Sequence, residues 1–163
     1  MGNFHEYDAQ AGTIKMSDIT SDEGNAEILR RLKNNEPGLT SMCMCNEEEE
    51  MDNNDYFPES ARDMGWLGYF LGNNTHLTNL SCFHLDSFNG ITEPFCKELS
   101  KNDSIQSILF CDSDISECDI FRFMVPFFKN INTLTELELD KCEMRAEVGR
   151  SLSLALGGAE TYL

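Results

Sequence analysis

Basic residues and long apolar runs are scarce in this sequence. Its 163 residues include 12 Lys and Arg against 29 Asp and Glu, so the formal net charge is −17 at pH 7. Nucleic-acid phosphates and anionic membrane surfaces attract Lys and Arg, so this balance argues against both as partners. The longest apolar run, between Ile120 and Phe128, contains Arg122 and is too short to span a bilayer.

The opening residues 1–6 are polar and no apolar run of the needed length follows them, which predicts that the chain carries no secretion signal. The sequence contains seven cysteines, an odd number. We interpret them as free thiols, which behave as small apolar groups when buried. The expected location is therefore a reducing intracellular compartment, the cytoplasm.

Patterns that carry chemistry are also missing. The acidic stretch 46–55 lacks the Gly at the sixth position of an EF-hand loop, so a solvated loop is favoured over weak calcium binding. Cys43 and Cys45 have no second pair or nearby His, so outward-facing thiols are favoured over a metal site. Ser81 and His84 would point to opposite faces of a strand, which argues against a catalytic triad. We expect no enzyme activity, no cofactor and no metal.

The sequence does contain a repeated pattern of strand and helix. Leucines in 134–139 have the spacing of a short strand, whereas Val148, Leu152 and Leu156 step by four, as in the buried stripe of a helix. The strand pattern recurs at successive distances of 29, 28 and 38 residues toward the N-terminus. The corresponding strand positions are Ile105, Ile108 and Phe110; Leu77, Leu80 and Cys82; and Leu39, Met42 and Met44. The helical stripes that accompany the strands include Phe95 with Leu99, Leu67 with Leu71, and Met124 with Phe128.

This period, with the pattern LxxLxL and a following helix, resembles the ribonuclease-inhibitor type of leucine-rich repeat over about residues 22–163. The resemblance implies an α/β solenoid, a short curved stack of about four strand–helix units. Its parallel sheet would form the concave face and its helices the convex face. In this family a residue eight positions after the strand start hydrogen-bonds the loop backbone, and Cys142, Ser113 and Leu85 occupy that position here.

The expected domain organisation has two parts. Residues 1–21 are polar and lack periodicity, which predicts a flexible acidic tail. Residues 22–163 form the repeat domain, with an acidic insertion near 46–57. No polar capping repeat follows Leu156, so the C-terminal end of the stack is expected to be truncated or covered by a partner.

The candidate site is the side of the strands that points away from the core. Its expected partner-binding residues are Asn79, Ser81, Phe83, Ser107, Leu109, Cys111, Glu136, Glu138 and Asp140. Apolar anchors beside acidic side chains favour a partner protein with a basic surface. The expected function is therefore a protein–protein interaction module. Two alternatives remain open: a regulator of an enzyme or small GTPase, of the inhibitor or GTPase-activating type, and a nonfunctional fragment of a longer repeat protein. The oligomeric state is also left open.

Overall fold

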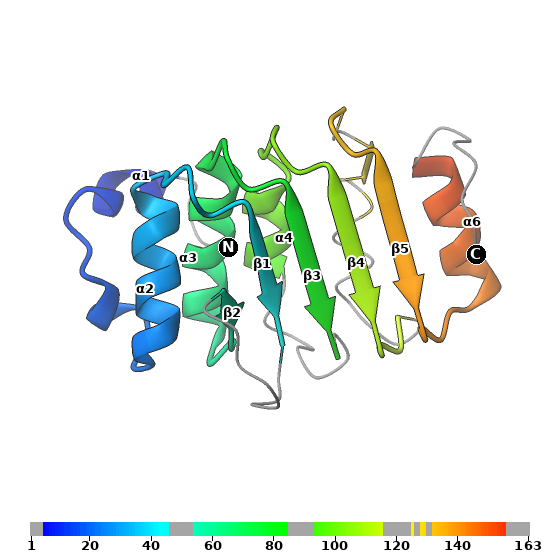
Figure 1. Ribbon diagram of the computed structural model, residues 1–163, viewed down its shortest axis with the longest axis horizontal. Coiled ribbons are helices and arrows are strands. Elements are labelled where there is room, and N and C mark those ends of the chain that lie inside the picture. Colours follow the sequence, from blue (N-terminus) through cyan, green and yellow to red (C-terminus); the bar gives the residue numbers. More distant parts are fainter. Residues whose placement is uncertain are drawn as a thin grey trace.

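The structure, a computed structural model, describes residues 5–45, 54–84, 93–115, 125, 128–129 and 132–155. The described chain has mixed α/β architecture, with a five-stranded parallel sheet and helices along one side of it (Figure 1). Its helices are α1 (His5–Ala11), the 3₁₀ helix η1 (Met16–Asp18), α2 (Glu23–Lys33), α3 (Ala61–Asn73), α4 (Glu93–Leu99) and α6 (Ala146–Ala155). Its strands are β1 (Ser41–Met44), β2 (Asp55–Tyr56), β3 (Asn79–Phe83), β4 (Ser107–Cys111) and β5 (Glu136–Asp140).

The strands lie in the order β2-β1-β3-β4-β5, and every neighbouring pair is parallel. Met42 is paired with Leu80, Leu80 with Ile108, and Ile108 with Leu137. These are equivalent positions of the four predicted strands, so the parallel sheet and its register are confirmed. Spacings of 38, 28 and 29 residues in the sequence thus become single steps across the sheet.

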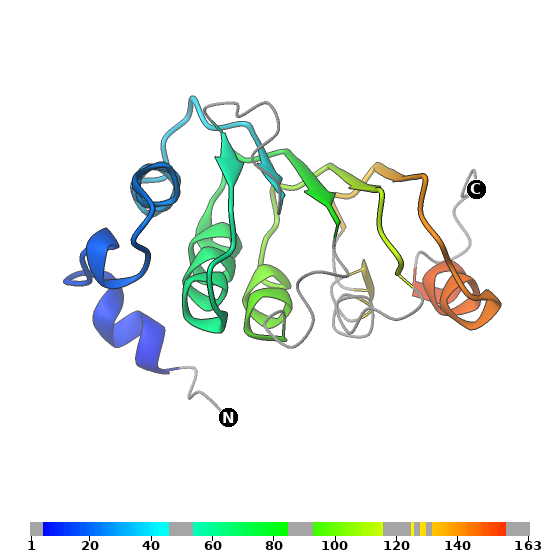
Figure 2. The ribbon, with the colours of Figure 1, turned by 90° about the horizontal axis from the view of Figure 1, so that it is seen from below.

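One face of the sheet is covered by helices, and no described helix lies on the other (Figure 2). Strand β3 follows the burial pattern exposed, buried, half-buried, buried, half-buried, because successive strand residues point to opposite faces. The inward positions Leu80, Cys82, Ile108 and Phe110 are all at most 1% exposed. The period-two pattern in the sequence therefore separates a core face from an outer face.

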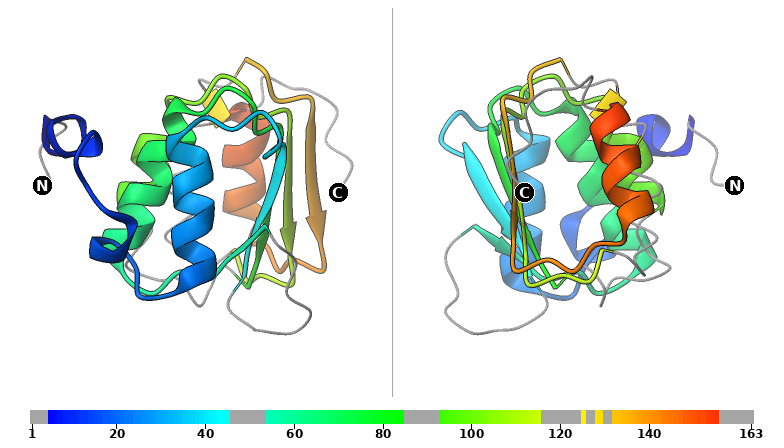
Figure 3. Two further views of the ribbon diagram at one scale, coloured as in Figure 1. Left: turned by 60° about the vertical axis from the view of Figure 1, so that its left-hand side comes forward. Right: turned by 90° about the vertical axis from the view of Figure 1, so that its right-hand side faces the viewer.

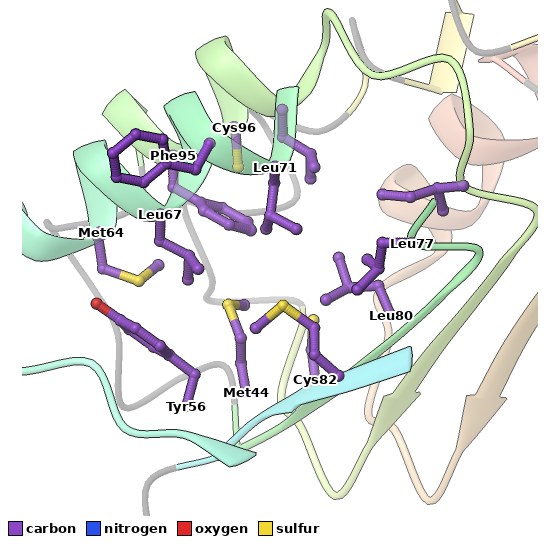
Figure 4. Close-up of a cluster of buried hydrophobic side chains, with 14 of the residues drawn as sticks. Met44, Tyr56, Met64, Leu67, Leu71, Leu77, Leu80, Cys82, Phe95 and Cys96 are labelled. Atoms are coloured by element: carbon purple, nitrogen blue, oxygen red, sulfur yellow. The ribbon is translucent and has the colours of Figure 1, made fainter. Parts of the chain in front are cut away.

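Apolar side chains from the strands and from the inner sides of the helices form the core (Figure 4). Met64, Leu67 and Leu71 of α3 point toward Met44 of β1, as Figure 4 shows. All four are fully buried. Burying one such side chain contributes about 1.5–3 kcal/mol relative to leaving it in water. This packing holds the sheet and the helical layer together.

Helix α3 begins with a capping box. The Ser60 side chain accepts a hydrogen bond from the Asp63 amide, and Asp63 Oδ1 accepts one from the Ser60 amide at 2.6 Å. The buried Asp63 carboxylate also accepts bonds from the Tyr56 hydroxyl and the Glu59 amide. Polar groups buried in this way keep their hydrogen bonds, which fixes the start of the helix against strand β2.

Glycines on α3 allow α4 to approach closely. A Cβ at Gly68 would lie 2.6 Å from the Phe95 carbonyl oxygen, and one at Gly72 would lie 2.3 Å from the Glu98 carbonyl oxygen. Both obstacles are backbone atoms, which cannot rotate away. Any side chain at these two positions would therefore push the helices apart.

The N-terminal segment differs from the sequence-based prediction. Residues 5–21 were expected to form a loose tail, yet they include α1 and η1 and pack on the domain. The Tyr7 ring lies 4.8 Å from the Trp66 ring, and Tyr69 donates a hydrogen bond of 2.9 Å to Asp8. Ile19 is only 6% exposed. The prediction of a loose tail is thus corrected for residues 5–21, because isolated aromatic and aliphatic residues are enough to anchor this segment. Residues 1–4 lie outside the described residues.

The insertion predicted near 46–57 also needs a correction. Its last part is not a solvated loop, because Asp55 and Tyr56 form β2 and pair with Cys43 and Met44. Tyr56 is fully buried and donates to Asp63. Residues 46–53, together with the predicted positions Leu85, Met124 and Leu156, lie outside the described residues.

Candidate functional site

The candidate site is the outer face of β3, β4 and β5, which we call the sheet face. All nine predicted residues lie on these strands, and the register groups them in three rows across the sheet. The rows are Asn79, Ser107 and Glu136; Ser81, Leu109 and Glu138; and Phe83, Cys111 and Asp140. Neighbouring strands lie about 4.8 Å apart, so one partner can touch all three residues of a row.

Exposure follows the prediction for eight of the nine residues. Asn79, Glu136, Glu138 and Asp140 are exposed. A second group is half-buried and comprises Ser81, Phe83, Ser107 and Leu109. The sheet face thus places the partly exposed apolar side chains of Phe83 and Leu109 beside the acidic side chains of β5.

Cys111 is the exception, because it is only 6% exposed although its position in the strand predicts an outward side chain. Its thiol lies 3.2 Å from Asp112 Oδ2 and 3.4 Å from Asp140 Oδ2, and it donates to both carboxylates. These neighbours cover it. Cys111 is therefore a hydrogen-bond donor beneath the surface and not a contact residue, which corrects its assignment as a partner-binding residue.

The same contacts determine the acidity of this thiol. Burial, followed by the hydrogen bond to Asp112, raises the pKa of Cys111 to about 12. A negative thiolate would be poorly solvated here and would face two carboxylates. Cys111 therefore stays a neutral thiol at physiological pH, without the reactivity of a thiolate.

Cys43 and Cys45 lie at the other end of the sheet. Both cysteines are half-buried. Met42, before Cys43, and Met44, between the two cysteines, are buried, which confirms that the two thiols lie on the outer face. Burial raises the pKa of both thiols, and the charge of Asp55 raises it further. The pair is therefore protonated at neutral pH and carries no activated nucleophile.

The turns after the strands contain a feature that sequence reasoning missed. His84, Asp112 and Lys141 each follow the last residue of β3, β4 or β5, and their φ angles are 53°, 48° and 50°. Left-handed backbone is uncommon outside glycine, although His and Asp adopt it more readily than most residues. These positions are 28 and 29 residues apart, as the strands are, and this spacing is a sequence signal that could have identified a repeated turn after each strand.

Loop anchors beside the strands hold this geometry. Cys142 Sγ donates to the carbonyl oxygens of Phe110 and Asp140 at 3.4 Å, and Ser113 Oγ donates to that of Cys111 at 2.8 Å. The family resemblance implied such a bond for an Asn or Cys, the match that Cys142 provides; Ser113 departs from that pattern and still bonds the backbone. These bonds hold the first residues of the loops that follow β4 and β5 against the ends of the strands.

A second set of anchors precedes the strands and was not predicted. Asn102 Oδ1 accepts from the amides of Ser104 and Ile105, and its Nδ2 donates to the carbonyl oxygens of Leu71 and Asn74. Asn74 Oδ1 likewise accepts from two following amides, three residues before the β3 pattern begins. An asparagine three residues before each of two strand patterns was the sequence signal.

Negative charge dominates the β5 side of the sheet face. Glu136, Glu138 and Asp140 lie in one column along β5. Asp112 adds a fourth carboxylate in the turn directly after β4. Lys141 Nζ lies 4.0 Å from Asp112 Oδ2, and its side chain is 69% exposed. An ion pair this exposed and this long neutralises little of the column. The arrangement can attract a cationic side chain.

The described residues contain neither a metal-binding cluster nor a membrane-spanning helix. Within the described residues, no three His, Cys, Asp or Glu side chains are grouped so that they could hold a metal ion. No described helix is long and apolar enough to cross a membrane.

Comparison with known proteins gives little further guidance. No protein-family model matches the chain, and no curated protein does. Among solved structures, the chain is similar to one described as leiomodin-1 actin-binding site 2. The identity is 15%, the similarity covers 82% of this chain and 87% of that chain, and the TM-score is 0.49. At this identity and TM-score the similarity does not identify a function.

Proposed function

We propose that this chain is a leucine-rich-repeat module of the ribonuclease-inhibitor-like type, and that it binds a partner protein with a basic surface through the sheet face. The stacked register of four equivalent strand positions supports the repeat assignment. The observation that carries the function is the row of Ser81, Leu109 and Glu138, where polar, apolar and acidic side chains lie side by side on an accessible strand face.

Each part of this face has a physical role in binding. Leu109 and Phe83 supply apolar surface whose burial stabilises a complex, since interface energy concentrates in a few desolvated anchors. The β5 carboxylates attract Lys and Arg, and charges at the edge of an interface act mainly on the association rate. Binding should therefore weaken as ionic strength rises, because salt screens exposed charges within about 8–10 Å.

The test compares three variants of the full chain in pull-downs from cell extract at physiological salt, with bound proteins identified by mass spectrometry. Leu109→Glu and Glu138→Lys change the sheet face, whereas Asp103→Lys changes an exposed residue in the loop before β4. We expect a partner that the unchanged chain and Asp103→Lys retain and that both face variants lose. Equal retention by all variants would refute the proposal.

A further inference from the structure

The two edges of the sheet are built differently. On the β2 side the edge strand has only two residues, and its Tyr56 is fully buried. Very short edge strands are one way in which proteins prevent unwanted pairing. On the other side β5 has five residues, and no described strand pairs with its outer edge. Figure 3 (right) looks onto this end of the molecule, with β5 and α6 nearest the viewer.

The apolar side chains of β5 are less buried than their counterparts. Leu80 and Ile108 are at most 1% exposed, but Leu137, their neighbour in the same row, is only half-buried. Leu139 is half-buried too, whereas the equivalent Phe110 is 1% exposed. Leu137 and Leu139 therefore pack against the core, but each is only partly buried. Each interior strand has a neighbouring strand on both of its sides, whereas β5 has a described neighbour only on its β4 side.

The backbone of β5 has a defined set of groups that point outward. Glu136 donates its amide to the Gln106 carbonyl, and the Asp140 carbonyl accepts from the Asp112 amide. In a parallel ladder, alternate residues bond to alternate sides. Glu136, Glu138 and Asp140 therefore direct their backbone groups toward β4. The amides and carbonyls of Leu137 and Leu139 point the other way, toward the edge at which no described strand pairs.

The side chains restrict what can pair there. A strand added in the same register would place alternate residues beside Glu136, Glu138 and Asp140, and the residues between them beside Leu137 and Leu139. Cationic side chains complement the first set, and aliphatic side chains complement the second. A second copy of this chain does not fit, because antiparallel pairing of two β5 strands would set their carboxylates opposite one another.

We propose that the outer edge of β5 binds an extended segment of a partner protein in which basic and aliphatic residues alternate, and that the segment pairs parallel to β5 as an additional strand. Main-chain hydrogen bonds supply affinity in such complexes, and alternate side chains supply specificity. The basic residues lie along the sheet face, so the proposal shares its acidic column with the proposed function. It differs in requiring backbone pairing at the edge.

The test uses a synthetic peptide in which lysines alternate with leucine and valine, and the full chain. In the proposed register the lysine amides point toward β5 and the aliphatic amides point away, as the Glu136 and Leu137 amides do relative to β4. N-methylation of the lysines therefore blocks the ladder, whereas N-methylation of the aliphatic residues leaves it intact. The two methylated peptides are matched in charge and composition.

Binding is measured by isothermal titration calorimetry, and amide hydrogen exchange is followed over 135–141. We expect lysine methylation to weaken binding by about tenfold or more, because several ladder hydrogen bonds are lost together. Methylation of the aliphatic residues should leave binding unchanged. The amides of Leu137 and Leu139 should exchange more slowly when the unmethylated peptide is bound.

Charge variants provide the second control. Glu138→Lys should weaken binding of the peptide by about tenfold, and Asp103→Lys should have no effect. Equal binding of both methylated peptides would overturn edge pairing but leave sheet-face recognition standing. No binding of any peptide, or a dimer of the free chain detected by analytical ultracentrifugation, would overturn the edge proposal alone. Sheet-face recognition fails separately, if the pull-down variants retain the same partners.

Discussion

The close approach of α3 and α4 leads to the sharpest prediction about stability. Replacing Gly68 by alanine adds a Cβ at 2.6 Å from the Phe95 carbonyl oxygen and 2.7 Å from its Cα. Contacts below 3.0 Å with backbone atoms can be relieved only by moving a helix. Forcing extra volume into a packed interior costs about 1–3 kcal/mol, with larger values where nothing can rotate away.

A second effect acts in the opposite direction. Alanine favours the helical state over glycine by about 1 kcal/mol, because glycine loses more backbone entropy on folding. The clash at Gly68 outweighs this gain, so we expect Gly68→Ala to lower the free energy of unfolding by about 1–2 kcal/mol. For a domain of this size the midpoint of thermal unfolding should fall by about 2–4 °C per kcal/mol.

Gly149 of α6 is the matched control, since the nearest atom to a Cβ there is Met144 Cε at 3.6 Å. That is ordinary van der Waals contact, so Gly149→Ala should raise the free energy of unfolding by up to about 1 kcal/mol. Urea unfolding followed by circular dichroism at 222 nm measures both changes, with the denaturant slope checked for constancy. A Gly68→Ala variant as stable as the unchanged chain would refute the described packing of α3 against α4.

Four other predictions follow from single contacts. Leu137→Asp should unfold the chain by burying a charge in the inner face of the sheet, whereas Leu109→Glu should keep its circular dichroism spectrum; equal loss in both would show the face assignment to be wrong. Asn102→Ala should cost about 1–3 kcal/mol in urea unfolding, since the Ser104 and Ile105 amides lose their acceptor and the Leu71 and Asn74 carbonyl oxygens each lose one of two donors; an unchanged midpoint would contradict this. Iodoacetamide should alkylate Cys111 at pH 8 more slowly in the folded chain than in urea, because its pKa is raised to about 12; mass spectrometry of the labelled peptide gives the rates, and equal rates would contradict the burial. Hydrogen bonds from Thr20 and Ser21 lower the pKa of Glu59 below 4.5 in the folded chain, so its contribution to stability is present above pH 4.5 and is lost as the pH falls through the lowered pKa; Glu59→Gln should reduce this acid dependence of the urea midpoint, and an unaltered profile would exclude the contribution.

The charge balance and the apolar spacing were properties of the sequence alone, and they determined much of the architecture. Leucine and isoleucine at LxxLxL positions specify a strand with one buried face, because residues two apart share a side. Distances of 28 and 29 residues between copies then specify the register, so the row of Leu80, Ile108 and Leu137 was predictable from the sequence. The same alternation identified the sheet face, including Leu109 and Glu138.

Other features depended on which residues meet in space. Tyr7 lacks periodic neighbours, so nothing in its local sequence predicted that it would stack on Tyr69 and pack against Trp66. Strand β2 follows a run of acidic residues. It became a strand because the Cys43 and Cys45 amides donate to the carbonyl oxygens of Asn54 and Tyr56, and because the Tyr56 hydroxyl donates to the Asp63 carboxylate. Long-range partners override local propensity in both cases.

The sequence by itself therefore determined the strand faces, the register and the acidic character, since each depends on spacing or composition within the chain. Only the tertiary structure decided that Cys111 is covered by two carboxylates, that Gly68 touches the Phe95 backbone, and that the outer edge of β5 has no described neighbour. These facts depend on distances between segments far apart in the chain, and a one-dimensional pattern carries no measure of such distances.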